Sequence, residues 1–177
     1  VMEPLRGGRL AQSIPEDIRE VWDSFPIKRS PVEWAFRWIY NFPEVAVILS
    51  GVSTMEQLKE NIEIFANAAP NSMTEEELEL VAQVKAMYES KIKVDCTSCN
   101  YCMPCPSGVE IPRIFSMYNT ASMFNVFDEQ ARHYRRLIDE KKDASNCVEC
   151  AQCEGACPQN IEIIEKLKDA HEALTSS

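Results

Sequence analysis

The sequence predicts a mainly α-helical protein in which two strand–helix units precede a helical region rich in cysteine. Three observations lead to this fold class. Apolar residues recur at helical spacing over much of the chain, the first 70 residues alternate between strand and helix patterns, and all eight cysteines follow residue 95. The chain has 177 residues, 45% of them hydrophobic, which is ordinary for a globular protein.

The first 70 residues show the strand–helix alternation. Residues 1–5 and 45–49 are the expected strands, and the second is apolar throughout, as buried parallel strands tend to be. Ser30 and Glu33 form a capping box around Pro31 and so predict a helix start. The helices expected here cover residues 16–25, 31–39 and 54–65. We therefore divide the chain into residues 1–70, a linker helix over 71–94 that is capped at Thr74, and a third region over 95–177.

The eight cysteines form two runs with nearly the same spacing. The first run, followed by Pro106, is Cys96, Cys99, Cys102 and Cys105. The second run, followed by Pro158, is Cys147, Cys150, Cys153 and Cys157. Three thiolates two residues apart can wrap three corners of an iron–sulfur cube, and the cysteine before proline can reach a second cube. Because the second run matches the bacterial two-cluster ferredoxin spacing residue for residue, the sequence predicts two 4Fe–4S clusters.

Two other uses of the cysteines stay open. Structural zinc is the more serious, because two four-cysteine sites would also consume eight thiolates. Zinc motifs normally consist of separated cysteine pairs, however, whereas each run here has three closely spaced cysteines and a fourth before proline. Disulfides are the weaker alternative, because cysteines two residues apart are poorly placed to pair with each other.

In the two-cluster arrangement, the last cysteine of each run is a ligand of the other cluster. The ligands expected for cluster A are Cys96, Cys99, Cys102 and Cys157. The ligands expected for cluster B are Cys147, Cys150, Cys153 and Cys105. The first run departs from the usual pattern, because two residues rather than three precede its last cysteine. Cys105 is therefore the ligand that the sequence supports least.

The surroundings of the cysteines are predicted to be helical. Apolar residues repeat at helical spacing over 111–118, 126–138 and 161–174. The two runs are thus held between helices, and residues 95–177 resemble the α-helical ferredoxin modules of succinate dehydrogenase and heterodisulfide reductase subunits.

Charge and hydropathy limit the possible partners. The net charge of −10 argues against nucleic acid, whose binding proteins present a basic surface. No apolar run approaches the roughly 20 residues of a membrane-spanning helix. We expect a cytoplasmic protein that docks to a redox partner, either a flavoprotein or a ferredoxin, with an unknown oligomeric state.

Four segments resemble an aldo-keto reductase that carries a C-terminal ferredoxin module. They are residues 2–10 (MEPLRGGRL), 32–38 (VEWAFRW), 48–61 (ILSGVSTMEQLKEN) and 99–106 (CNYCMPCP). The resemblance implies that residues 1–70 are a partial (β/α) barrel remnant made of the last two β/α units. It also implies a longer, NADP-dependent parent enzyme. The half of the barrel with the family's catalytic Asp, Tyr, Lys and His has no counterpart here, so we expect no catalytic residue and no carbonyl reductase activity.

The same resemblance implies that this chain contains only part of an NADP site. Residues expected along the pyrophosphate are Pro4, Leu5, Arg6 and Gly8. Residues expected at the adenosine half are Gly51, Ser53, Gln57, Glu60 and Asn61. A helix that opens at Ser53 and Thr54 would present free N–H groups to phosphate. The simpler alternative is that Ser53 or Thr54 only caps the helix, with Glu60 and Asn61 on a solvated face.

Three functions follow from these observations. The leading one is an oxidoreductase fragment, an iron–sulfur electron-transfer module fused to an NADP-dependent aldo-keto reductase. In the second, the clusters or zinc ions are purely structural. In the third, the chain is a stand-alone electron carrier.

Overall fold

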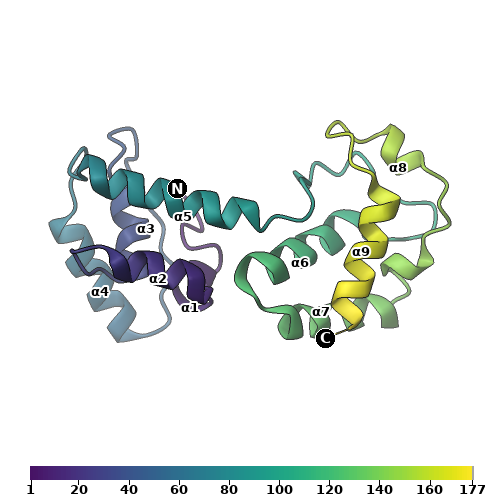
Figure 1. Cartoon of the computed structure of the whole chain (residues 1–177), viewed down its shortest axis with the longest axis horizontal. Coiled ribbons are helices and arrows are strands. Elements are labelled where there is room, and N and C mark those ends of the chain that lie inside the picture. The colour runs from purple at the N-terminus through teal and green to yellow at the C-terminus, as the bar shows by residue number, and fades with distance from the viewer. Residues whose placement is uncertain (177) are drawn as a thin grey trace. The chain divides into compact units, whose positions relative to one another are not determined.

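The computed structural model describes residues 1–176, and its regular structure is helical (Figure 1). The chain divides into two compact units, Val1–Tyr88 and Glu89–Ser177. The first unit contains α1 (Arg9–Gln12), α2 (Glu16–Ser24), α3 (Pro31–Tyr40), α4 (Met55–Asn67) and most of α5 (Glu75–Ser90). The second contains α6 (Ile111–Phe124), α7 (Phe127–Asp139), the 3₁₀ turn η1 (Ala144–Asn146), α8 (Gln152–Gly155) and α9 (Ile163–Thr175).

Three helices of the first unit, α3, α4 and α5, begin where side chains cap them, as the sequence predicts. Ser30 accepts the N–H of Glu33 at 3.1 Å at the start of α3. Thr54 and Gln57 form a complete capping box on α4. In α3 and α4 the caps satisfy N–H groups that have no partner within the helix.

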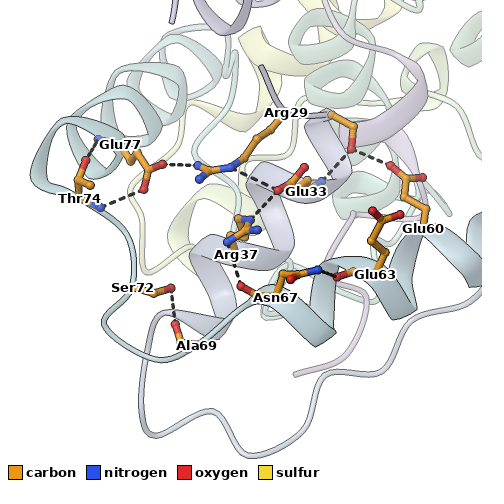
Figure 2. A network of polar contacts seen from close by, with 11 residues as sticks. Arg29, Glu33, Arg37, Glu60, Glu63, Asn67, Ala69, Ser72, Thr74 and Glu77 are labelled. Atoms are coloured by element: carbon orange, nitrogen blue, oxygen red, sulfur yellow. Dashed lines mark hydrogen bonds and ion pairs between the residues drawn. The ribbon is translucent and has the colours of Figure 1, made fainter. Parts of the chain in front are cut away.

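The core of the first unit centres on Trp34 of α3. Its ring stacks on Trp22 of α2 with centroids 5.2 Å apart, and Arg29 lies 4.6 Å above the same ring. Arg29 also pairs with Glu77 of α5, which is almost fully buried. Figure 2 shows the pair within a network that joins the starts of α3 and α5. Glu77 additionally accepts the N–H of Thr74 at 2.9 Å, so one carboxylate both caps α5 and neutralises Arg29.

The two expected strands are wrong, because residues 1–5 and 45–49 form no strand in the part of the chain described here. Residues 4 and 5 belong to a turn, Glu3 has a positive φ of 49°, and one pair of hydrogen bonds joins Val1 to residues 47–49. The N-terminal amine of Val1 donates to the Val47 carbonyl at 2.8 Å, and the Leu49 N–H donates to the Val1 carbonyl at 2.9 Å. This is the pattern of two parallel chains. A single such pair makes no ladder, and Val47 and Leu49 are 62% and 54% exposed, so the segment is not buried either.

The second unit is built around α6, α7 and α9, which pack against one another. Their apolar faces meet in a core where Phe115, Tyr134, Leu137 and Leu167 are fully buried. Asn125, in the left-handed conformation at φ 52°, ends α6 and turns the chain into α7. The predicted helical surroundings of the cysteines are thereby confirmed.

Among the helices of residues 1–176, none combines the length and the apolar character needed to cross a bilayer.

Candidate metal centre

One pocket of the second unit collects cysteines from both runs. Its four cysteines are Cys96, Cys99, Cys102 and Cys157, the set that the sequence assigns to cluster A. Three come from a single loop and the fourth from a segment more than 50 residues later. The apolar part of the wall is Ile111, Pro112, Phe115, Pro158, Ile161 and Ile163. The structure therefore provides a four-cysteine pocket with an apolar wall, although iron binding there remains a prediction.

Burial follows the same pattern in both cysteine runs. The second cysteine of each run, Cys99 or Cys150, is exposed, while the other six are partly buried against the core of the unit. No disulfide joins any of these eight cysteines. One expected ligand of each cluster thus faces solvent, and the other expected ligands face the protein.

Burial also changes the acidity of the thiols. It raises the pKa of Cys153 to about 11, although nearby backbone N–H groups oppose the change. It raises the pKa of Cys102 as well, and the neighbouring Cys96, Cys99 and Cys157 add to the increase. Because metal centres bind thiolates, loading these sites releases protons.

The backbone repeats its conformation in the two cysteine loops. Ser98 and Asn100, two and four residues after Cys96, have φ values of 55° and 65°. Glu149 and Ala151, two and four residues after Cys147, have φ values of 55° and 59°. Left-handed residues at matching places let each loop curl around its own three cysteines.

The repeat continues beyond the last cysteine of each run. The N–H of Gly108 bonds the Cys105 carbonyl at 2.9 Å, and the N–H of Asn160 bonds the Cys157 carbonyl at 3.2 Å. Gly108 and Asn160 both have positive φ, at 75° and 52°. The sequence then reads Val-Glu-Ile or Ile-Glu-Ile into the following helix, α6 or α9. Cys105 thus occupies the place of Cys157, despite the shorter spacing before it.

Each half also has a polar side chain that holds the segment entering its cysteine loop. In α6, the Asn119 side chain accepts the N–H groups of Lys93 and Val94, each at 3.0 Å. In the second half, the hydroxyl of Tyr134 accepts the Ala144 N–H at 3.0 Å. Nδ1 of His171, in α9, lies 2.8 Å from the same hydroxyl. Asn119 and His171 lie at equivalent places, each eight residues after the first residue of its helix.

One feature is present in the second half alone. Glu154, between the last two cysteines of its run, accepts the N–H of Ile164 at 2.9 Å. Its carboxylate therefore caps the first turn of α9. The corresponding part of the first run contains Met103 and Pro104, which carry no charge, and Ile164 corresponds to Pro112 of α6, which has no N–H.

The residues proposed to hold NADP have partners within the first unit. Gln57 accepts the N–H of Ser53 at 2.9 Å as part of the α4 cap. Asn61 is buried and donates to Ser50 at 2.9 Å, and Glu60 accepts from Ser30 at 2.7 Å. Gln57 therefore has the simple capping role, whereas the solvated face expected for Glu60 and Asn61 is wrong, because Asn61 is buried and Glu60 is partly buried.

The other expected NADP contacts lie in the two loops of the first unit. Pro4, Leu5, Arg6 and Gly8 lie in a turn that enters α1. Gly51 is exposed, and a Cβ there would meet no atom within 4 Å. The backbone around Gly51 is therefore open to solvent.

A family model for the 4Fe-4S dicluster domain matches residues 95–162, a span that contains all eight cysteines. Comparisons with curated proteins and with solved structures give no match. The C-terminal part of the chain therefore carries a ferredoxin-type 4Fe–4S domain, which indicates iron–sulfur electron transfer. None of these comparisons supports the aldo-keto reductase resemblance or NADP. Within residues 1–176, no group of three or more His, Cys, Asp or Glu side chains is placed to hold a single metal ion.

The loop anchors and the internal repeat were not predicted from the sequence. The repeat had a readable signal, because Cys-Pro, one further residue, Gly or Asn, and then Val-Glu-Ile or Ile-Glu-Ile follow both runs. The anchors had none, because Asn119 and Val94 are 25 residues apart and Tyr134 and His171 are 37 apart.

Proposed function

We propose that the unit Glu89–Ser177 is a one-electron carrier that holds two 4Fe–4S clusters. The observation that carries this proposal is the pocket that gathers three cysteines of the first run with Cys157 of the second. That exchange between runs is what a two-cluster ferredoxin motif requires. By the internal repeat, Cys105 completes cluster B with the three leading cysteines of the second run.

The protein groups around the pocket suit an anionic cube held by four thiolates. Ile111 and Pro112, in the first turn of α6, line the pocket and bring the positive end of that helix toward it. Phe115 and Ile161 exclude water from the inner side. When bound, each cube supplies a one-electron couple whose potential depends on local charge, hydrogen bonds and exposure.

The exposed corners of the site support electron exchange with another protein. Cys99 and Cys150 reach the surface, so a docked partner can approach a ligand of either cluster. The partner class that we propose is a flavoprotein or a ferredoxin, because each handles single electrons. Purely structural clusters are the competing function, since metal centres also stabilise small domains.

Metal analysis tests the ligand set first. Anaerobic protein should contain about eight irons and eight acid-labile sulfides per chain and no stoichiometric zinc. Cys157→Ser should reduce the iron content by up to half, because it removes one ligand of one cluster, and Ser24→Ala, at an exposed position of the first unit, serves as the control. Two zinc ions per chain in protein purified without oxygen would contradict the proposal.

Potentiometry monitored by EPR then separates the carrier from the structural centre. Reversible reduction at a potential accessible to flavins or ferredoxins supports electron transfer. Clusters that stay redox-silent, in a protein that unfolds when they are chelated, would establish the structural role.

A second candidate function concerns the first unit, which we propose belongs to the barrel of an NADP-dependent aldo-keto reductase. The parallel hydrogen bonds of Val1 with Val47 and Leu49 favour it, because neighbouring barrel strands are parallel. The exposed apolar side chains of Val47 and Leu49 also suit burial by further barrel elements. The contacts of Gln57 and Asn61 within the unit weigh against a preformed NADP site.

Titration of the whole chain with NADPH tests this second candidate. We expect weak binding, detected as enhanced nicotinamide fluorescence, that Ser53→Ala reduces further. We also expect NADPH alone to leave the 4Fe–4S absorbance unchanged, because hydride transfer delivers two electrons and each cluster accepts one. Binding that Ser53→Ala and Gly51→Val both leave unaltered would remove this site from consideration.

A further inference from the structure

The two halves of the second unit differ in charge at equivalent places. The residues between Cys96 and Cys105 include no Asp, Glu, Lys or Arg. Those between Cys147 and Cys157 include Glu149 and Glu154. Since the backbone repeats closely in the two loops, this difference in charge is a difference in the surroundings of the two clusters.

The two carboxylates of the second loop are not equivalent. Glu149 is exposed and lies 3.0 Å from Lys168, so its charge is balanced by a cation and screened by water. Glu154 directly follows Cys153, is partly buried, and is held by the Ile164 N–H at 2.9 Å. Its carboxylate thus has a fixed position beside one ligand of cluster B.

The position of Glu154 affects cluster B in two ways. Its negative charge opposes the addition of an electron nearby, and partial burial strengthens that effect. It also occupies the N-terminal end of α9, whose positive potential would otherwise favour the reduced cluster. In the first half, the equivalent end of α6 lines the pocket of cluster A, and Pro112 stands in place of Ile164.

We propose that Glu154 makes cluster B the lower-potential member of the pair and so sets the direction of electron flow through the protein. This inference rests on the proposed two-cluster electron carrier. With both clusters bound, an external one-electron donor would reduce cluster B, and the passage of that electron to cluster A would reoxidise cluster B. No proton is transferred between the clusters. The electron leaves from cluster A, whose loop presents the exposed Cys99 and Tyr101 to an acceptor.

The test is an anaerobic redox titration of the loaded full chain with dithionite, followed by EPR. The unaltered protein should show two reduction waves. Glu154→Gln keeps an oxygen acceptor for the Ile164 N–H but removes the charge. We expect the equilibrium constant for reduction of cluster B to rise about tenfold, so the midpoint potential of the lower wave should rise by about 59 mV, the value for one electron. The upper wave should stay in place.

Two further variants separate the charge effect from general damage. Glu165→Gln removes a carboxylate from the same turn of α9, but that carboxylate is exposed and pairs with Lys168, so both waves should move little. Ile164→Pro introduces the residue that α6 has at this place. It removes the N–H that holds Glu154, so the lower wave should rise even though the charge remains.

The outcomes distinguish this inference from the function on which it rests. A single wave for both clusters in the unaltered protein would overturn the inference. So would two waves of which Glu154→Gln moves the upper one or neither. Clusters that dithionite cannot reduce reversibly would instead overturn the proposed electron carrier, and the inference with it.

Discussion

The side chain of Asn119 binds both polar groups of the Val94 backbone. It accepts the Val94 N–H at 3.0 Å and donates to the Val94 carbonyl at 2.7 Å. Val94 is itself buried, two residues before Cys96. One amide therefore fixes the entry of the first cysteine loop against α6.

Asn119→Ala should destabilise the second unit by about 1–3 kcal/mol, because it leaves the N–H of the buried Val94 without a partner and removes one of the two hydrogen bonds to its carbonyl, the other coming from the Cys96 N–H. Asn119→Asp should have a stability between those of the unaltered protein and Asn119→Ala, since a carboxylate accepts hydrogen bonds but does not donate them. Urea unfolding of the loaded protein measures both values. Because the anchor belongs to the first loop, the EPR signal of cluster A should weaken before that of cluster B. Equal loss of both clusters would contradict the assignment of this anchor to one loop.

Tyr134→Phe should cost about 1–2 kcal/mol, since the hydroxyl that accepts the buried Ala144 N–H is lost. Tyr101→Phe is the matched control, because Tyr101 is 69% exposed and should change stability by less than about 0.5 kcal/mol. Thermal unfolding of the two variants side by side gives the comparison. Similar melting temperatures would show that the hydroxyl of Tyr134 does not support the second loop.

The stability of the first unit should fall at alkaline pH. Burial raises the pKa of Tyr88 to about 12, and the charge of Asp17 adds to the effect. The folded state therefore binds the phenolic proton more tightly than the unfolded state, whose tyrosines have a pKa near 10. The stabilisation is complete below about pH 10 and is lost as pH rises toward 12, by up to ~2.7 kcal/mol. Urea unfolding at pH 8 and pH 11 should show this loss, and Tyr88→Phe should reduce it.

The buried pair of Arg29 and Glu77 should show strong coupling. Glu77→Ala removes the buried counter-charge of Arg29 and the cap of α5, and leaves the partly exposed Glu33, 3.3 Å away, as the remaining partner of Arg29, so we expect a loss of about 3 kcal/mol. Replacing both residues by apolar ones should cost less than Glu77→Ala alone. Glu140→Gln, which breaks an exposed pair with Lys142, is the control and should cost less than about 1 kcal/mol. A double-mutant cycle by chemical unfolding checks the coupling, and additive losses would argue against it.

Gly108 should tolerate the residue found at its equivalent place in the repeat. Gly108→Asn should be mild, because Asn160 has the same left-handed conformation. Gly108→Val should be severe, because a β-branched side chain is strained at φ 75°. Iron content and melting temperature of the two variants measure the difference. If the two behave alike, the turn after Cys105 does not depend on its left-handed residue.

Local sequence patterns predicted the helices well. The caps predicted at Ser30, Thr54 and Thr74 mark the starts of α3, α4 and α5, since a cap depends only on residues three or four apart. The prediction of two strands was wrong for the opposite reason. Residues 45–49 have the composition of a buried strand, but a strand depends on distant partners, and here one pair of hydrogen bonds joins the two segments.

In the candidate site, too, the features that depend on local spacing could be predicted and those that depend on distant contacts could not. Spacing alone grouped Cys157 with the first run, and the structure places it in that pocket. Spacing also made Cys105 the weakest ligand, whereas the backbone after it matches the backbone after Cys157. The position of Glu154 at the start of α9 could not be predicted, because it depends on how α8 and α9 meet.

The presence of Cys157 in the pocket of the first loop has a consequence for biosynthesis. A ribosome adds Cys96, Cys99 and Cys102 long before it adds Cys157. The nascent chain therefore exposes three reactive thiols for the time needed to translate more than 50 further codons. During that interval the thiols must be protected from oxidation and from stray metal ions, and a scaffold that delivers a preassembled cofactor has to wait until the later segment has emerged.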